Sequence, residues 1–149
     1  MAHRTAIART GLSRPMQLAI SVGIIGADDD VFDYGCGRGR DVRLLSESGI
    51  KAEGWDPSSY PSARKRSASI VNLGYVINVI SDSLERERAI QEAWQLAKNA
   101  LIVSARPMEE YAKAGSLRRY GDGFITLAGT FQKFFSQEEL RSIGITVTP

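Results

Sequence analysis

The chain has 149 residues, of which 43% are hydrophobic and 24% are charged, and its formal net charge is +2; these values suit one soluble globular domain. Its single cysteine, Cys36, and single histidine, His3, exclude an internal disulfide and a structural zinc site, which needs about four such ligands. A lone cysteine is consistent with a reducing cytoplasm, and no apolar run approaches the ~20 residues of a membrane helix.

The first half of the chain predicts two helices and two strands. Ser13 is placed to cap the first helix, and Gly23 to end it. Gly49 is typical of the stop after the second helix. The predicted elements are a helix over 12–23, a strand over 31–34, a helix over 39–50 and a strand over 51–55.

The clearest predicted helix lies in the second half of the chain. Asp82 is placed to cap it, with Glu85 three residues later. Its apolar stripe is predicted to be buried and consists of Ile90, Ala93, Trp94 and Ala97. The predicted elements are a loop over 56–68, a strand over 69–73, this helix over 81–100 and a strand over 100–105.

The last part of the chain is less regular. Ser136 with Glu139 is spaced as a capping box. Phe131, Phe134 and Phe135 recur at helical spacing, which favours a core face over a base-stacking surface. The predicted elements are a short helix over 108–115, a turn over 118–124, a helix within 130–144 and the start of a strand over 144–149.

Strands that alternate with helices of this length indicate βαβ units. Such units form a mostly parallel sheet with helices on both faces and right-handed crossovers. The sequence therefore predicts an α/β fold with three αβα layers.

The most informative segment is the glycine-rich loop after the first predicted strand, DYGCGRG over 33–39. Glycines between a strand and a helix allow a tight turn and close approach to a ligand. Asp56 ends the next strand 21 residues after Gly35, where an acidic residue binds the ribose hydroxyls of a nucleoside cofactor. Asp33, two residues before the first glycine, would repel a pyrophosphate but suits a cation. This pattern favours S-adenosyl-L-methionine over a nicotinamide dinucleotide.

DYGCGRG resembles the first motif of class I S-adenosylmethionine-dependent methyltransferases, D/E-x-G-x-G-x-G, and VINVISD is similar to a later region of that superfamily. The resemblance implies a Rossmann-like fold, reduced here because the chain lacks a helix and a strand after the second strand and has an incomplete C-terminal hairpin. It implies that Asp56 binds the ribose, and Trp55 is a candidate to cover the adenine or to pack in the core. The residues that it implies around the rest of the cofactor are Asp33, Tyr34, Gly35, Cys36, Gly37, Asn72 and Leu73.

A more specific resemblance covers nearly the whole chain. The stretches HRTAIARTGLSRP, FDYGCGRGRDVRLL, GWDP, VNLGYVINVI and GDGFITLAGTFQKFF together resemble methyltransferases associated with DNA phosphorothioation systems of bacteria. The resemblance implies a cytoplasmic bacterial protein with DNA and proteins of such a system as partners. Basic spots could meet phosphates or could be a solvated surface; they consist of Arg64, Lys65, Arg66, Arg118 and Arg119, besides His3, Arg4, Arg9 and Arg14 near the N-terminus.

The stretch NLGY, from Asn72 to Tyr75, has the spacing of the Asn/Asp–Pro–Pro–Tyr motif of amino-methylating DNA enzymes. By that resemblance, Asn72 and the Leu73 carbonyl would accept the two amine hydrogens of an extruded base, and Tyr75 would stack on the base. The alternative is that Asn72 ends the central strand and Tyr75 packs the next segment. Asn72 and Tyr75 are the only catalytic candidates, and no metal ligands are predicted.

Three functions follow from these patterns. The first is an S-adenosylmethionine-dependent methyltransferase that acts on DNA. The second is a non-catalytic module of the same system that binds the cofactor or DNA, and the third is a small-molecule or RNA methyltransferase. The predicted organisation is one domain with a helical arm over 1–27, a cofactor-binding core over 28–107 and a C-terminal helical and substrate region over 108–149.

Overall fold

The computed structural model of the chain describes residues 11–143. The basic residues His3, Arg4 and Arg9 and the strand predicted over 144–149 lie outside the described residues. Within residues 11–143, no helix combines the length and the apolar character that a membrane span requires.

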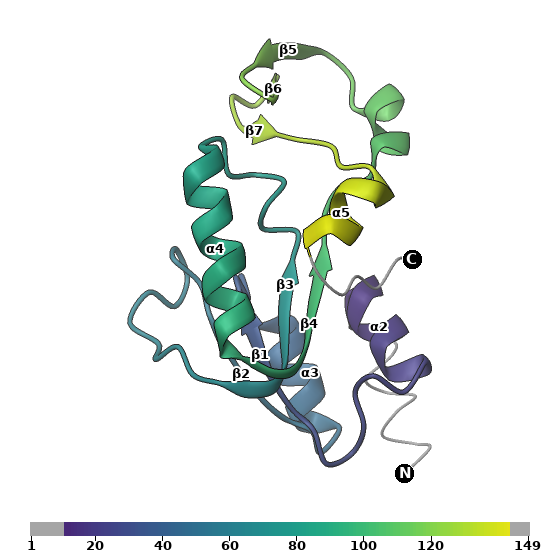
Figure 1. Cartoon of the computed structure of the whole chain (residues 1–149), viewed down its shortest axis with the longest axis vertical. Coiled ribbons are helices and arrows are strands. Elements are labelled where there is room, and N and C mark those ends of the chain that lie inside the picture. The colour runs from purple at the N-terminus through teal and green to yellow at the C-terminus, as the bar shows by residue number, and fades with distance from the viewer. Residues whose placement is uncertain (1–10, 144–149) are drawn as a thin grey trace.

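The centre of the structure is a sheet of four parallel strands in the order β2-β1-β3-β4 (Figure 1). Each predicted strand of the first 107 residues is present. In the register of the sheet, Asp33 of β1 lies beside Asn72 of β3. The strands are β1 (Asp30–Tyr34), β2 (Lys51–Trp55), β3 (Ala68–Gly74) and β4 (Ala97–Ser104).

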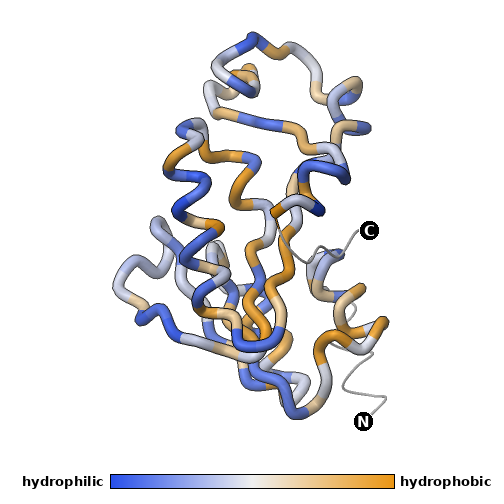
Figure 2. The backbone as a smooth tube through the Cα atoms, viewed as in Figure 1, coloured by the Kyte–Doolittle hydropathy of each residue, from blue (hydrophilic) through white to orange (hydrophobic). Residues whose placement is uncertain are grey.

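Helices cover both faces of this sheet because alternate residues of each strand point to opposite faces. On one face, Val31 belongs to a buried cluster with residues of α2 (Arg14–Ser21) and α3 (Arg40–Glu47). On the other face, Phe32 belongs to a second cluster that includes residues of α4 (Ser83–Leu96). Figure 2 shows the hydrophobic colour along the neighbouring strands β3 and β4. The predicted three-layer, mostly parallel α/β fold is confirmed.

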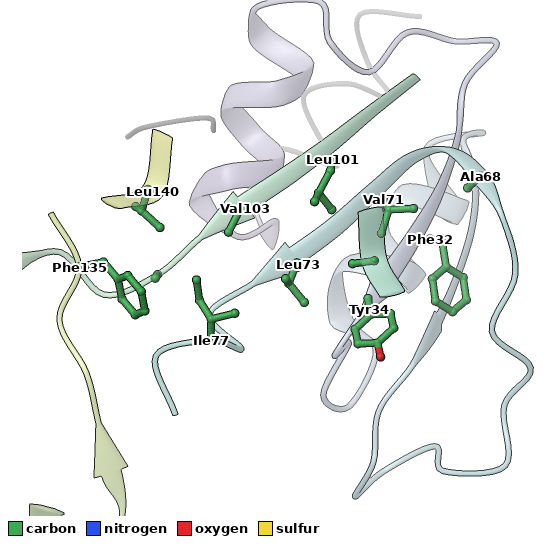
Figure 3. Close-up of a cluster of buried hydrophobic side chains, with 12 residues drawn as sticks. Phe32, Tyr34, Ala68, Val71, Leu73, Ile77, Leu101, Val103, Phe135 and Leu140 are labelled. Carbon is green, nitrogen blue, oxygen red and sulfur yellow. The ribbon is translucent and has the colours of Figure 1, made fainter. Parts of the chain in front are cut away.

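Between β2 and β3 the structure lacks the helix and the strand that were predicted to be missing. Residues 56–67, which connect these two strands, form turns and a single β-bridge between Asp56 and Tyr60. The second cluster continues beyond the sheet, where Phe135 and Leu140 pack towards Leu73, Ile77 and Val103 (Figure 3).

A small second sheet stands apart from the first (Figure 1). It contains three antiparallel strands, so the turn predicted over 118–124 is part of a hairpin. We call residues 107–135 the C-terminal lobe. Its elements are the 3-10 helix η1 (Met108–Lys113), β5 (Leu117–Tyr120), β6 (Gly123–Thr126) and β7 (Phe131–Gln132), and α5 (Gln137–Ile143) follows it.

The helix predicted within 130–144 starts later than expected. Phe131, Phe134 and Phe135 are buried, as predicted, but Phe131 lies in β7 and none of the three lies on a helix. The capping box is confirmed, since the Glu139 amide donates to Ser136 Oγ at 3.1 Å and the Ser136 amide donates to Glu139 Oε1 at 3.2 Å. Helical spacing was therefore misleading where short β pairing took precedence over local propensity.

Two further helix predictions need correction. Ser13 does not cap α2 with its side chain; its hydroxyl donates to Asp41 of α3 at 2.6 Å and so joins two helices. Trp94 is 51% exposed, because it lies about 100° around α4 from the buried Ala93. Ala97 belongs to β4, while the Asp82 cap is confirmed by its bond from the Leu84 amide at 2.9 Å.

Leu101 and Leu127 test this assignment of the core. Leu101 on β4 is fully buried, whereas Leu127 in the turn after β6 is 86% exposed. We expect Leu101→Ala to lower the free energy of unfolding by about 2–5 kcal/mol through lost burial and a residual cavity. Leu127→Ala, the same chemical change, should alter it by less than about 0.5 kcal/mol. Urea unfolding followed by circular dichroism measures both, and equal effects would contradict the assigned core.

Candidate functional site

Buried polar side chains gather where three neighbouring strands end. Asp33, Asn72 and Ser104 are 6%, 3% and 4% exposed, and they come from β1, β3 and β4. Asn72 Nδ2 donates to Asp33 Oδ1 at 3.1 Å. In the part of the chain that the structure describes, Asn72 Oδ1 and Ser104 Oγ have no hydrogen-bond partner. Buried polar atoms without partners are costly and are typical of sites that bind a ligand or water.

The Asp33 carboxyl is the acid of this group, and its pKa is strongly raised. Burial, together with the negative charges of Asp41 and Asp56, raises its pKa to about 7, although the Asn72 hydrogen bond opposes the shift. No lysine or arginine within residues 11–143 forms an ion pair with Asp33. A cationic ligand would therefore gain a nearby counter-charge and would stabilise the ionised carboxylate.

The glycine-rich loop beside Asp33 uses its backbone amides within the protein. The amides of Gly35 and Cys36 both donate to the Trp55 carbonyl, at 2.7 and 2.9 Å, and the Gly37 amide donates to Asp56 Oδ1 at 2.9 Å. Gly35 has a φ of +90°, and a Cβ there would collide with the Val76 side chain. A phosphate cradle needs free loop amides, so this loop suits a cofactor without a pyrophosphate.

Asp56 holds the turn that follows β2. Its Oδ2 accepts hydrogen bonds from the amides of Ser58 and Ser59, both at 3.0 Å, while Oδ1 accepts the Gly37 amide. Burial alone would raise the Asp56 pKa, but these three bonds outweigh it and lower the pKa. A carboxylate has about four acceptor positions, so one position on Oδ1 is left for a ribose hydroxyl.

A pocket of about 470 Å³ opens on the α4 side of these strand ends. Trp55 and Asp56 border it from β2 and the turn after it, and Val76, Val79 and Ile80 border it from the loop after β3. We call this loop, from Tyr75 to Ile80, the 75–80 loop. The opposite wall is α4, which contributes Glu85, Arg88, Ala89 and Glu92. The pocket is therefore apolar along the loop and polar along the helix.

A cluster of four side chains fixes the aromatic wall of this pocket. The Tyr34 hydroxyl donates to Glu92 Oε2 at 2.6 Å, and Lys65 Nζ donates to Glu92 Oε1 at 2.8 Å. Lys65 Nζ also lies 4.0 Å from the centre of the Trp55 ring. Lys65, one of the three basic residues predicted over 64–66 to meet phosphates, is therefore already bound to other side chains of the protein.

The predicted cofactor residues do not all face the pocket. Tyr34, Gly35 and Asp56 border it, as does the catalytic candidate Tyr75, whereas Asp33 and Asn72 lie on the α2 and α3 face of the sheet. The Leu73 side chain is fully buried and packs with Tyr34 and Ile77 in the core (Figure 3), so only its backbone could meet a ligand.

Cys36 is half-buried within the loop. Burial, together with the nearby Asp33 and Asp56, raises the pKa of its thiol to about 11. The neutral thiol suits the predicted role of a small loop residue and is a poor nucleophile.

NLGY differs from the predicted strand end. β3 continues to Gly74, which pairs with Ser104, so Asn72 lies inside the strand. Tyr75 follows with a φ of +57°, its amide donates to the Ser104 carbonyl at 2.8 Å, and its side chain is 41% exposed. A positive φ in a non-glycine residue costs about 1–3 kcal/mol and is frequent at functional sites. The strained Tyr75 at the pocket rim therefore stays a candidate to contact an acceptor.

Several site residues could not be predicted from the sequence. Ser104 ends an apolar strand and looked like ordinary core, and Arg88 and Glu92 lie among many charged residues of α4. Only a three-dimensional arrangement brings these positions to the same end of the sheet. The one usable signal was positional, because the carboxyl ends of parallel strands form the usual ligand site of such folds.

Solved structures resemble this arrangement, although no protein-family model and no curated protein matches the chain. The CcbJ methyltransferase of Streptomyces caelestis matches with a TM-score of 0.60 at 12% identity, over 89% of this chain and 77% of that chain. The CalS10 amino pentose methyltransferase of Micromonospora echinaspora, solved with S-adenosylmethionine bound and involved in calicheamicin biosynthesis, matches with a TM-score of 0.53 at 14% identity, over 96% and 86%. The chain shares the α/β fold of these two methyltransferases.

A third structure with this fold is a SAM-dependent methyltransferase of Thermotoga maritima, described as a possible histamine N-methyltransferase. It matches with a TM-score of 0.50 at 18% identity, over 95% of this chain and 73% of that chain. The fold therefore agrees with the resemblance of DYGCGRG to the methyltransferase superfamily, and at identities of 12–18% the likeness shows the fold alone.

Replacement by asparagine should change the free energy of unfolding in opposite directions at Asp33 and Asp56. The folded-state pKa of Asp33 is raised, so its contribution to stability falls as pH rises from about 4 to 7. We expect Asp33→Asn to raise the free energy of unfolding at pH 8 by roughly 1–3 kcal/mol, with a smaller gain at pH 5.

Asp56→Asn provides the matched control. The folded-state pKa of Asp56 is lowered, so its ionised form stabilises the protein above the unfolded pKa, and that contribution is lost as pH falls through the folded pKa. Asp56→Asn should therefore destabilise the protein at pH 8. Thermal unfolding from pH 5 to 8 measures both variants, and a destabilised Asp33→Asn variant at pH 8 would contradict the assigned pKa shift.

Proposed function

We propose that the chain binds S-adenosylmethionine and transfers its methyl group. The observation that carries the proposal is the buried Asp33 carboxyl, with a pKa raised to about 7 and no cationic partner within the described residues, beside a glycine loop whose Gly35, Cys36 and Gly37 amides are already bonded. S-adenosylmethionine has an ammonium group and a methyl sulfonium but no phosphate. The methyltransferase fold of the solved neighbours supports the same cofactor.

The two sides of the strand ends suit different parts of this cofactor. Asp33 and the unpartnered Asn72 Oδ1 suit the ammonium group of the methionine part. The apolar and aromatic wall around Trp55 and Val76 suits the adenine ring, and the last acceptor position of Asp56 suits a ribose hydroxyl. In this assignment the residues bind, orient and shield the cofactor, and positioning contributes most of the rate enhancement.

We propose DNA as the acceptor, in the cytoplasm and within a phosphorothioation or other modification system. This proposal rests on the sequence resemblance and on exposed cations of the C-terminal lobe. Arg118 and Arg119 on β5 are exposed and form no ion pair within residues 11–143. Arg66 is paired with Glu53 at 2.6 Å, and Lys65 is paired as described above. Arg64 is exposed and forms no ion pair within the described residues, so the proposed contact surface comprises the lobe and Arg64.

A small molecule or RNA is the second candidate acceptor. The descriptions of two solved neighbours, an amino pentose methyltransferase and a possible histamine N-methyltransferase, favour an amine on a small molecule. The strained Tyr75 at the rim of a 470 Å³ pocket would suit either a small ring or an extruded base. A non-catalytic module that only binds the cofactor or DNA is the outcome expected if binding occurs without methyl transfer.

The cofactor proposal predicts pH-dependent binding. Calorimetry with S-adenosylhomocysteine, the demethylated product, should detect binding to the wild type, with affinity that falls about tenfold per pH unit below pH 7 as Asp33 becomes protonated. Asp33→Asn should weaken binding at least tenfold at pH 8 while it stabilises the fold.

Asp28→Asn is the control, because Asp28 is exposed before β1 and away from the pocket. It should bind as the wild type does. If the wild type does not bind the ligand, or if Asp33→Asn binds equally well, the cofactor proposal is wrong.

The acceptor proposal predicts salt-dependent transfer to DNA. Transfer of a tritiated methyl group to DNA should fall in an Arg118→Ala/Arg119→Ala variant. The slope of log affinity against log salt concentration should become shallower by an amount that corresponds to one or two lost phosphate contacts. Arg66→Ala should change neither quantity, because Arg66 is paired with Glu53. Transfer to small amines with none to DNA would favour the second candidate instead.

A further inference from the structure

The 75–80 loop lies between the pocket and the C-terminal lobe. On one side it supplies pocket residues, and the Val76 side chain fills the space that a Cβ on Gly35 would occupy. On its other side, two of its carbonyls accept hydrogen bonds from outside the loop. The position of this loop therefore depends on contacts that do not touch the pocket.

The lobe holds the loop directly at Asn78. The Asn78 carbonyl accepts the Lys133 amide at 2.8 Å and Gln132 Nε2 at 3.3 Å. The Gln132 side chain is itself 6% exposed. The end of β7 thus forms hydrogen bonds with the middle of the 75–80 loop.

The second link runs through Arg86 on α4, which is 7% exposed. Its Nη2 and Nε donate to the Ile80 carbonyl at 2.8 and 3.2 Å. Its Nη1 and Nη2 also donate to the two carboxylate oxygens of Asp122 at 2.7 and 3.0 Å. One guanidinium therefore joins the end of the loop to the turn between β5 and β6, in the bidentate geometry that arginine favours.

The lobe can act as one unit in this linkage. Its two ends lie side by side, since the Phe135 amide donates to the Arg106 carbonyl at 2.9 Å and the Met108 amide donates to the Phe135 carbonyl at 3.1 Å. Asp122 lies far along the chain from these paired ends, in the turn between β5 and β6. Within the described residues, its carboxylate forms hydrogen bonds and an ion pair with Arg86. The Arg86 hydrogen bonds hold the pKa of Asp122 below its usual range, so this carboxylate is ionised at neutral pH.

We propose that Arg86 is a positioning residue that couples the C-terminal lobe to the cofactor pocket. Arg86 and Asp122 do not line the pocket; they hold the 75–80 loop, whose Val76, Val79 and Ile80 do. An acceptor that contacts the lobe would stabilise the loop position that binds the cofactor, and the cofactor would favour acceptor binding by the same factor. This inference rests on the proposed function.

The test is a double-mutant cycle on cofactor affinity. Arg86→Met should weaken S-adenosylhomocysteine binding about tenfold, because the loop then spends less time in its binding position. Asp122→Asn should weaken it less, since Arg86 can still bond Ile80. The double variant should bind no worse than Arg86→Met alone, a non-additivity that two independent losses of stability would not produce.

Arg66→Met is the matched control, because it makes the same chemical change and breaks an ion pair with Glu53 that does not touch the loop. It should bind as the wild type does. Wild-type affinity in Arg86→Met, or fully additive effects of the two substitutions, would overturn the proposal.

Hydrogen exchange in the ligand-free protein separates this inference from the proposed function. In Asp122→Asn, which keeps the Ile80 contacts and should fold, the amides of Val79 and Lys133 should exchange faster than in the wild type, while the amide of Val71 in β3 should not. If the wild type binds no S-adenosylhomocysteine, the proposed function fails while this measurement still decides whether the lobe holds the loop. Unchanged exchange at Val79 and Lys133 would show that it does not.

Discussion

The proposed binding site depends on one unfavourable burial, that of the Asp33 carboxyl at the end of β1. The side chain is 6% exposed and is met by the Asn72 amide rather than by a cation, so its pKa rises to about 7. A buried, unpaired carboxyl lowers stability, and an apolar residue would pack there without that cost. The presence of Asp33 is explained if a ligand supplies the counter-charge, which places the binding site at the carboxyl ends of the strands.

The neighbouring glycine loop limits which ligand that is. The loop folds onto the end of β2, where the Trp55 carbonyl and the Asp56 carboxylate accept the amides of Gly35, Cys36 and Gly37. These bonds hold the loop in shape without a ligand, so little ordering is needed on binding. They also occupy the amides that would hold a phosphate. A cationic, phosphate-free nucleoside fits both the loop and Asp33. With the proposed coupling, the lobe that holds the 75–80 loop would make the pocket respond to a bound acceptor.

Much of this could be predicted where the signal is local. The loop from Asp33 to Gly39, the acid at Asp56 and the alternation of helices and strands predicted the confirmed fold, because glycine conformation and hydrophobic period depend on nearby residues. Other features depend on distant pairing. The hydrogen bonds of Arg86 to Asp122 join residues 36 positions apart, and a carbonyl such as that of Trp55 acts as an acceptor whatever its side chain. The phenylalanines over 131–135 show the converse, since their helical spacing lies before the start of α5. Trp94 lies within α4 but away from its buried side.

Asp33 is proposed to be the counter-charge of a cationic ligand, and proton release on binding tests this role most directly. Calorimetry of S-adenosylhomocysteine binding in buffers of different ionisation enthalpy measures the protons released. A free-state pKa of about 7 predicts release of roughly half a proton at pH 7, less at pH 8.5 and more at pH 6. Binding with no proton release across this range would show that Asp33 is already ionised or does not meet the ligand, and would contradict the account.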